Sequence, residues 1–126
     1  MLVLDSGAVS RLAERSRASA ALIVAFREEG LWPATVPSVV LVECLRGHAG
    51  RDANENQFLK TCDVLDRIPE SLARRAALLR TRARRGSAVD ALVVAIAEPG
   101  GTVLTTDPED LEALAVHAQR VVIERV

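Results

Sequence analysis

Short apolar runs alternate with helix-like segments along the whole chain, and this alternation constrains the fold more than any other feature. The runs are brief and continuously apolar, as in strands that are buried on both faces of a parallel sheet. Strands that alternate with helices are typical of an α/β domain. We therefore predict a mainly parallel sheet covered by helices on both faces. Strands are expected at residues 2–5 (LVLD), 31–37 (LWPATVP), 63–69 (DVLDRIP), 102–107 (TVLTTD) and 120–126 (RVVIERV).

The segments between these runs have the spacing, composition or stop residues of helices. Residues 19–29 place Leu22, Ala25 and Phe26 on one face and end before Gly30, a common helix terminator. Further helices are expected at residues 8–15, 39–46, 55–62, 70–85, 88–97 and 108–118, and residues 49–56 (AGRDANEN) are expected to form an exposed linker.

Length and composition favour one folded domain over residues 1–126. Apolar residues make up 49% of the chain, which excludes a disordered protein. No apolar run reaches the roughly 18 residues of a membrane span, and the first residues lack the basic segment of a signal peptide. Cys44 and Cys62 have no metal-binding or redox spacing. We therefore expect a cytoplasmic protein without membrane association, in which both cysteines are reduced.

Six arginines lie in a stretch without acidic residues, although the net charge of the whole chain is only −1. An arginine-rich stretch can be a solvated helix face, or it can contact the phosphates of a nucleic acid. The sequence leaves both interpretations open. The arginines are Arg74, Arg75, Arg80, Arg82, Arg84 and Arg85.

Two aspartates end predicted strands. Asp5 ends the first apolar run, and Asp107 ends the fourth. Each has an ordinary structural explanation, because Asp5 can cap a helix that begins near Ala8 and Asp107 can cap a helix whose first residue is Pro108. In an open parallel sheet, however, ligands bind beyond the carboxyl ends of the strands, where the strand order reverses.

Two further carboxylates lie in predominantly apolar helices. Glu43 is the only charge in the segment VPSVVLVECL, and it can pair with Arg46 three residues later. Asp90 follows Ser87 at the spacing of a capping box. Local structure can explain each carboxylate singly, but all four can also converge on one edge of the sheet. Such a cluster of oxygen ligands suits Mg²⁺ or Mn²⁺, whereas no cysteine or histidine spacing supports zinc.

The ordered segments LVLDSGAV, VPSVVLVECLRG, SAVDALVVAIA and GTVLTTDPEDL resemble the PIN-domain family, specifically the VapC-type toxin ribonucleases of toxin–antitoxin pairs. The resemblance spans essentially the whole chain. It implies a three-layer α/β/α fold, a metal-dependent endoribonuclease with Mg²⁺ or Mn²⁺ as cofactor, a homodimer, and a cognate antitoxin as partner. By motif match, the acidic positions of the family are taken by Asp5, Glu43, Asp90 and Asp107.

The resemblance also assigns auxiliary residues. Thr105 matches the hydroxyl residue two positions before the last aspartate, and Asp110 stands where related sequences often carry an acid. The chain departs from the family at Gly7, two positions after the first aspartate, where Ser or Thr is usual. Ser6 is an alternative source of that hydroxyl.

The implied reaction makes physical demands that the sequence can meet. Phosphodiester cleavage needs an activated water and neutralised phosphate charge, and a divalent metal supplies both. Carboxylates position the metal, and one of them can orient the water or accept its proton. The only aromatic rings are Phe26, Trp32 and Phe58. We therefore expect recognition of RNA shape and backbone rather than stacking of single-stranded bases.

Other classes of protein also cluster acids at strand ends. A response-regulator receiver needs paired acids after the first strand and a lysine near the last, but Asp5 is followed by Ser6 and the only lysine is Lys60. An aspartate-nucleophile phosphatase needs an Asp-x-Asp motif, which is absent after the first strand. The remaining alternative is a catalytically silent PIN-like module that binds protein or RNA. The intact acidic set argues against that alternative.

Overall fold

The computed structural model describes all of residues 1–126, and a five-stranded sheet forms its centre. The strand order is β3-β2-β1-β4-β5, and every pair of neighbouring strands is parallel. The predicted parallel sheet is therefore confirmed. The strands are β1 (Leu2–Leu4), β2 (Thr35–Pro37), β3 (Asp63–Leu65), β4 (Thr102–Thr105) and β5 (Val122–Arg125).

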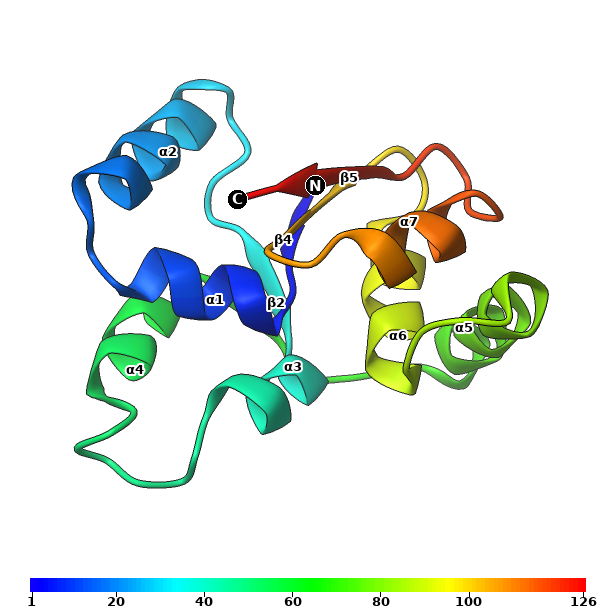
Figure 1. The fold of residues 1–126 in the computed structure, drawn as a ribbon, viewed down its shortest axis with the longest axis horizontal. Coiled ribbons are helices and arrows are strands. Elements are labelled where there is room, and N and C mark those ends of the chain that lie inside the picture. The colour runs from blue at the N-terminus through cyan, green and yellow to red at the C-terminus, as the bar shows by residue number, and fades with distance from the viewer.

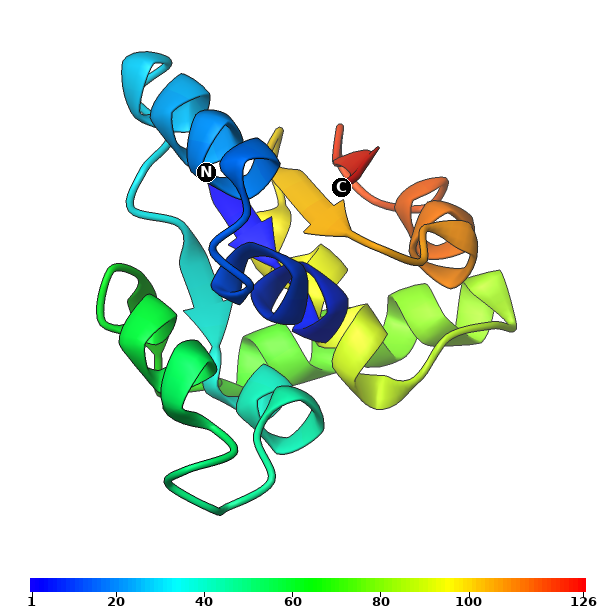
Figure 2. The same ribbon diagram turned by 60° about the vertical axis from the view of Figure 1, so that its left-hand side comes forward.

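Seven helices surround the sheet in two layers (Figure 1; Figure 2). Helices α1, α2 and α4 lie on one face, α5, α6 and α7 lie on the other, and α3 lies near the carboxyl end of β2. The predicted three-layer α/β/α arrangement is confirmed. None of the helices combines the length and the hydropathy needed to cross a bilayer. The helices are α1 (Ser6–Ala13), α2 (Arg17–Glu28), α3 (Ser38–Cys44), α4 (Ala53–Leu59), α5 (Glu70–Ala83), α6 (Ala88–Ala97) and α7 (Glu109–Ala115).

One cluster of 25 buried apolar residues connects the two helical layers through the sheet. Its centre is β1, where Leu2, Val3 and Leu4 are at most 1% exposed. The middle strand is covered on both faces, as its continuous apolar pattern predicts. On α6 the residues from Val93 to Ala97 are also buried, whereas Asp90 lies in the first turn at the rim of the core. The apolar part of α6 thus anchors the helix and leaves its carboxylate at the edge of the sheet.

Both cysteines are free and half-buried. Burial raises the pKa of Cys44 to about 11. It raises the pKa of Cys62 to about 11 as well. Both thiols are therefore protonated at neutral pH, in keeping with a structural role.

Several elements are shorter than the sequence predicted. The strand expected over residues 63–69 ends at Leu65, because β3 is an edge strand that pairs only with β2. The helix expected over residues 108–118 ends at Ala115. The paired part of the 31–37 run begins only at Thr35.

The prediction of an exposed linker over residues 49–56 was wrong at Asp52, which is only 4% exposed. Its carboxylate accepts hydrogen bonds from the backbone N–H groups of Arg46, Gly47 and His48, at distances of 2.8 to 3.2 Å. These bonds lower the pKa of Asp52, with the Arg46 N–H as the largest cause. Asp52 therefore organises the turn that connects α3 to α4.

Candidate active site

The strand order reverses at the centre of the sheet, between β1 and β4. The chain runs outward from β1 through β2 to β3 and then crosses to β4 on the other side of β1. Such a switch point opens a crevice at the carboxyl ends of parallel strands. A pocket of about 290 Å³ lies there, which we call the acidic pocket. Its lining residues are Asp5, Ser6, Gly7, Glu43, Ser87, Asp90, Thr106, Asp107, Asp110 and Leu111.

The acidic pocket brings together the four carboxylates that the sequence singled out. Asp5 follows β1 and Asp107 follows shortly after β4, so the parallel pairing of these strands places both at one edge. Glu43 reaches the pocket from α3, and Asp90 reaches it from the first turn of α6. The proposed auxiliary residues that line the same pocket are Ser6 and Asp110.

Asp5 is held in one orientation by hydrogen bonds to both carboxylate oxygens. Oδ1 accepts from the Ala8 N–H at 2.8 Å, so Asp5 caps α1 as predicted. Oδ2 accepts from the hydroxyl of the fully buried Thr105, whose Oγ1 accepts in turn from the Asp107 N–H at 3.0 Å. Thr105 therefore couples the ends of β1 and β4. A helix cap and a site role are compatible, since each carboxylate oxygen has a further lone pair.

Glu43 does not form the pair with Arg46 that the sequence offered as an alternative to a site role. Helix α3 ends at Cys44 and Leu45 is extended, with φ −105° and ψ 151°, so Arg46 no longer lies one helical turn after Glu43. The Arg46 N–H is used by Asp52 instead. The Glu43 carboxylate makes no hydrogen bond or ion pair within the chain, and it lines the acidic pocket.

The capping box at the start of α6 is confirmed. The Ser87 N–H donates to Asp90 Oδ2, and the Asp90 N–H donates to Ser87 Oγ, both at 3.0 Å. Because the cap uses Oδ2, the second oxygen of Asp90 is free to face a ligand. The capping box thus fixes the orientation of the Asp90 carboxylate and leaves one of its oxygens available.

The sequence allowed Asp107 to be either a cap of α7 or a site residue, and the structure shows no capping bond from it. The N-cap is Pro108, in a helical conformation with φ −78° and ψ −13°, and it has no side-chain capping bond. The exposed Asp107 carboxylate is therefore left to the pocket. Asp110 differs from it, since its Oδ1 accepts from Arg85 Nε at 3.0 Å while Arg85 Nη2 donates to Glu109 at 2.8 Å.

The carboxylates of the acidic pocket influence one another electrostatically. Burial raises the pKa of Asp5, hydrogen bonds from Thr105 and Ala8 oppose the rise, and the charge of Asp90 adds to it. Burial also raises the pKa of Glu43, with further contributions from the charges of Asp90 and Asp5. Like charges that share a site disfavour ionisation. Asp110 is paired with Arg85, but the other four carboxylates of the pocket form no ion pair within the chain.

The oxygen donors of the acidic pocket are of the kind that Mg²⁺ and Mn²⁺ prefer. Their mutual repulsion also favours a cation. As the side chains stand, however, no group of three acidic, histidine or cysteine residues is arranged to hold one metal ion. The donor chemistry and the shared pocket fit such an ion, and side-chain rotation at the unpaired Glu43 and Asp107 would be needed to complete a coordination sphere.

The structure shows why position 7 is glycine, which the sequence did not reveal. A Cβ atom at this position would lie 2.1 Å from Thr106 Oγ1, which is closer than any real contact. The side chain of Thr106 fills the space that the usual Ser or Thr at position 7 would occupy. Sequence reasoning singled out Thr105 and missed Thr106, because only the folded chain brings Thr106 against α1.

The six arginines of the acid-free stretch do not form one free cationic face. Arg75 is bound by both carboxylate oxygens of Glu98, at 2.7 and 2.8 Å, and also donates to the carbonyl of His117. The other partners found are Glu70 for Arg74, the carbonyl of Gly86 for Arg80, and Glu109 with Asp110 for Arg85. Only Arg82 and Arg84 are exposed without a side-chain partner.

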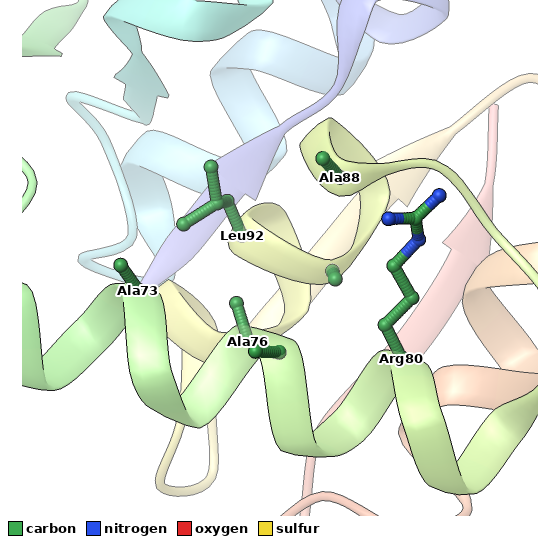
Figure 3. Close-up of a pocket in the computed structure, with 7 residues that line it drawn as sticks. Ala73, Ala76, Arg80, Ala88 and Leu92 are labelled. Atoms are coloured by element: carbon green, nitrogen blue, oxygen red, sulfur yellow. The ribbon is translucent and has the colours of Figure 1, made fainter.

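A second cavity of about 230 Å³ lies between α5 and α6 (Figure 3). Figure 3 shows Ala73 and Ala76 on α5 facing Leu92 on α6, with the side chain of Arg80 at one end. Apart from Arg80, the cavity is lined by alanines and Leu92, and no carboxylate lines it. The chemistry of the molecule is therefore concentrated in the acidic pocket rather than here.

Other solved structures share this fold, and two of them show the extent of the match. PAE2754 from Pyrobaculum aerophilum aligns with a TM-score of 0.64 and 16% identity, over 97% of this chain and 89% of that chain. FitAB bound to the IR36 DNA fragment aligns with a TM-score of 0.63 and 19% identity, over 99% of this chain and 94% of that chain. No protein-family model matches the chain, and no curated protein matches it in sequence. The fold is PIN-like, and at these identities the likeness shows the fold alone.

Proposed function

We propose that the protein is a metal-dependent endoribonuclease that cleaves RNA phosphodiester bonds in the acidic pocket. The observation that carries this proposal is the meeting of Asp5, Glu43, Asp90 and Asp107 at the switch point of a parallel sheet. The pKa values of Asp5 and Glu43 are raised, chiefly by burial and further by the charges of neighbouring carboxylates. The PIN-like fold supports the same reading.

The four carboxylates would hold Mg²⁺ or Mn²⁺, which supplies a Lewis acid and an activated water when bound. The roles of the chain's own residues follow from their contacts. Thr105 fixes Asp5 through Oδ2, and the capping box fixes Asp90 through Oδ2. Glu43 makes no hydrogen bond or ion pair within the chain, so its carboxylate is free to turn towards the metal.

RNA contacts are assigned first to Arg82 and Arg84, whose guanidinium groups are free. Arg85 can exchange its exposed partners Glu109 and Asp110 for a phosphate, because exposed ion pairs contribute little stability. Arg74 and Arg80 are exposed and can contribute similarly. Arg75 is engaged with Glu98 and is assigned a structural role.

The proposed biological class is a VapC-type toxin that forms a homodimer and is neutralised by a cognate antitoxin in the cytoplasm. This class rests on the four sequence segments that resemble the VapC-type toxins. Large apolar side chains that are exposed and available to a partner include Val42, at 82%, and Val116, at 78%. A catalytically silent binding module is the second candidate, favoured by the absence of three converging metal ligands.

Cleavage assays on the purified chain separate the two candidates. We expect cleavage of a structured RNA with Mg²⁺ or Mn²⁺, no cleavage with EDTA, and loss of cleavage in Glu43→Gln. A matched DNA of the same sequence is the control for nucleic-acid type, since the structural neighbour FitAB was solved bound to DNA. RNA binding without cleavage under every metal condition would favour the silent module.

A further inference from the structure

Thr106 carries the one threonine hydroxyl that lines the acidic pocket. It follows β4 directly and is half-buried. Its neighbour Thr105 uses its hydroxyl for two hydrogen bonds, to Asp5 and from Asp107. The Thr106 hydroxyl forms no hydrogen bond within the chain. It is therefore a donor without a partner in the chain, as the Ser6 hydroxyl is too, in a pocket whose other polar groups are mostly carboxylates.

Gly7 makes room for this hydroxyl. It lies in the first turn of α1, and its backbone does not require glycine, since it does not have the positive φ of Gly30 or Gly86. A glycine inside a helix is destabilising relative to alanine. Any side chain at position 7 would nevertheless collide with Thr106, whose Oγ1 and Cβ lie 2.1 and 3.3 Å from the position of a Cβ atom. Glycine at this position therefore leaves room for the Thr106 side chain where it stands, at the lining of the acidic pocket.

The chemistry of the proposed substrate explains why a neutral donor is useful there. The non-bridging oxygens of a phosphodiester only accept hydrogen bonds, and ionised carboxylates also only accept. A phosphate that enters the acidic pocket therefore needs donors as well as a cation. A hydroxyl supplies one without neutralising the carboxylates as an arginine would.

We infer that Thr106 positions the scissile phosphate by donating its hydroxyl hydrogen to a non-bridging oxygen, and that Gly7 provides the space for it. The inference rests on the proposed function. It predicts that Thr106 and Gly7 act as a unit. Because the contact is with substrate, its loss reduces cleavage without changing how the apo chain binds metal.

The test compares Thr106→Val with Thr106→Ser. The valine variant keeps the shape and removes the hydroxyl, and we expect kcat/KM for RNA to fall about a hundredfold, the lower end of the range for loss of one transition-state donor. Thr106→Ser should restore cleavage to within a few-fold of wild type. The thermal shift with Mn²⁺ should be the same in all three proteins. Thr102→Val, at the other end of β4, is the matched control and should cleave as wild type does.

A double-mutant cycle tests the link to Gly7. Gly7→Ala should reduce cleavage in the wild-type background, and it should cause no further loss in Thr106→Ala. If wild type cleaves RNA and Thr106→Val cleaves equally well, the inference is overturned while the proposed function stands. If wild type cleaves no RNA with either metal, both are overturned. Additive losses from Gly7→Ala and Thr106→Ala would also contradict the inference.

Discussion

Asp52 and the carboxylates of the acidic pocket show two opposite ways of holding negative charge. Asp52 is almost fully buried, but three backbone N–H groups surround its carboxylate and its pKa is lowered. Glu43 is largely exposed and has no donor at all, and partial desolvation together with the charges of Asp90 and Asp5 raises its pKa. Asp5 lies between these cases, with two donors that do not fully offset its burial.

The difference separates a carboxylate that serves the fold from carboxylates that serve a ligand. A structural carboxylate is supplied with donors by the chain, so it is stable as an anion without any addition. A ligand-binding carboxylate has oxygen atoms that accept no hydrogen bond from the chain. The acidic pocket contains several such oxygens, on Glu43, Asp90 and Asp107, and the turn from residue 46 to 52 contains none that lack a donor.

The largest expected effect is on cleavage in Asp90→Asn. Asparagine can keep the capping box, because its side-chain oxygen can accept from the Ser87 N–H, but it removes one charge from the acidic pocket. We expect cleavage to fall by about a hundredfold or more, as for disruption of a metal site. The melting temperature of the apo protein should stay the same or rise. A variant that melts earlier and still cleaves RNA would reduce Asp90 to a helix cap.

The opposite pattern is expected in Asp52→Asn. The substitution places an amide group against three N–H donors, and it should give the largest loss of thermal stability among these variants. Cleavage by the folded fraction should be unchanged, since the residue does not line the acidic pocket. Chemical denaturation and a cleavage assay at low temperature measure the two effects. If Asp52→Asn were as stable as wild type, Asp52 would not be a structural carboxylate and would not differ from those of the acidic pocket in this respect.

The arginines on and just after α5 allow the same comparison between a structural role and a ligand-binding role. Arg75→Ala should destabilise the protein by about 1–2 kcal/mol, because it removes charged hydrogen bonds to the largely buried Glu98. The double variant of Arg82 and Arg84 to alanine should keep stability, weaken RNA binding about tenfold and flatten its salt dependence. Arg17→Ala, on α2 in the other helical layer, is the control. If the salt dependence of RNA binding were unchanged in the double variant, Arg82 and Arg84 would belong to a solvated surface that does not contact RNA.

The smallest effect is a pH dependence of opposite sign at Glu43 and Asp52. A raised pKa in the folded state means that ionised Glu43 destabilises the fold at neutral pH, and that this cost is relieved as the pH falls through the raised pKa towards the ordinary 4.5. Glu43→Gln should therefore be slightly more stable than wild type at pH 7, by less than about 0.5 kcal/mol for an exposed charge, and equal to it in acid.

Asp52 should behave in the reverse sense. Its lowered pKa adds stability above the ordinary value of 3.8, and this stability is lost as the pH falls through the lowered pKa. The loss of stability in Asp52→Asn should therefore stay constant from neutral pH down to about the ordinary pKa of 3.8. It should shrink as the pH falls further. Urea titrations across the acid range measure both trends. If the stability of the two variants, relative to wild type, changed with pH in the same direction, the opposite roles of Glu43 and Asp52 would be contradicted.

The sequence predicted the parts of the molecule that depend on local pattern. The parallel sheet, the cap at Asp5 and the capping box at Asp90 follow from apolar runs and short spacings, and all are present. The meeting of the acids at one edge also follows, since parallel strands end together. The two caps depend only on neighbouring residues, and the sheet and the meeting of the acids follow from the general rule that parallel strands end at one edge.

The features that the sequence missed depend on local backbone geometry or on distant contacts. Pro108 takes the N-cap position of α7, so Asp107 is not a cap. Leu45 leaves the helix, so Glu43 loses Arg46. Asp52 is buried by a turn whose N–H groups converge only after folding. Gly7 meets Thr106, which is almost a hundred residues away in the chain. No spacing rule encodes such contacts.

Thermal melts of wild type and Glu43→Gln, each with and without Mn²⁺, test the central claim most directly. Glu43 supports no hydrogen bond of the fold, so the substitution alters only the charge of the acidic pocket. We predict that Mn²⁺ raises the melting temperature of wild type by mass action and has little effect on Glu43→Gln. Glu28→Gln, an equivalent change on α2, should respond as wild type does. Equal responses to Mn²⁺ in wild type and Glu43→Gln, or no response in wild type, would contradict a metal site in the acidic pocket.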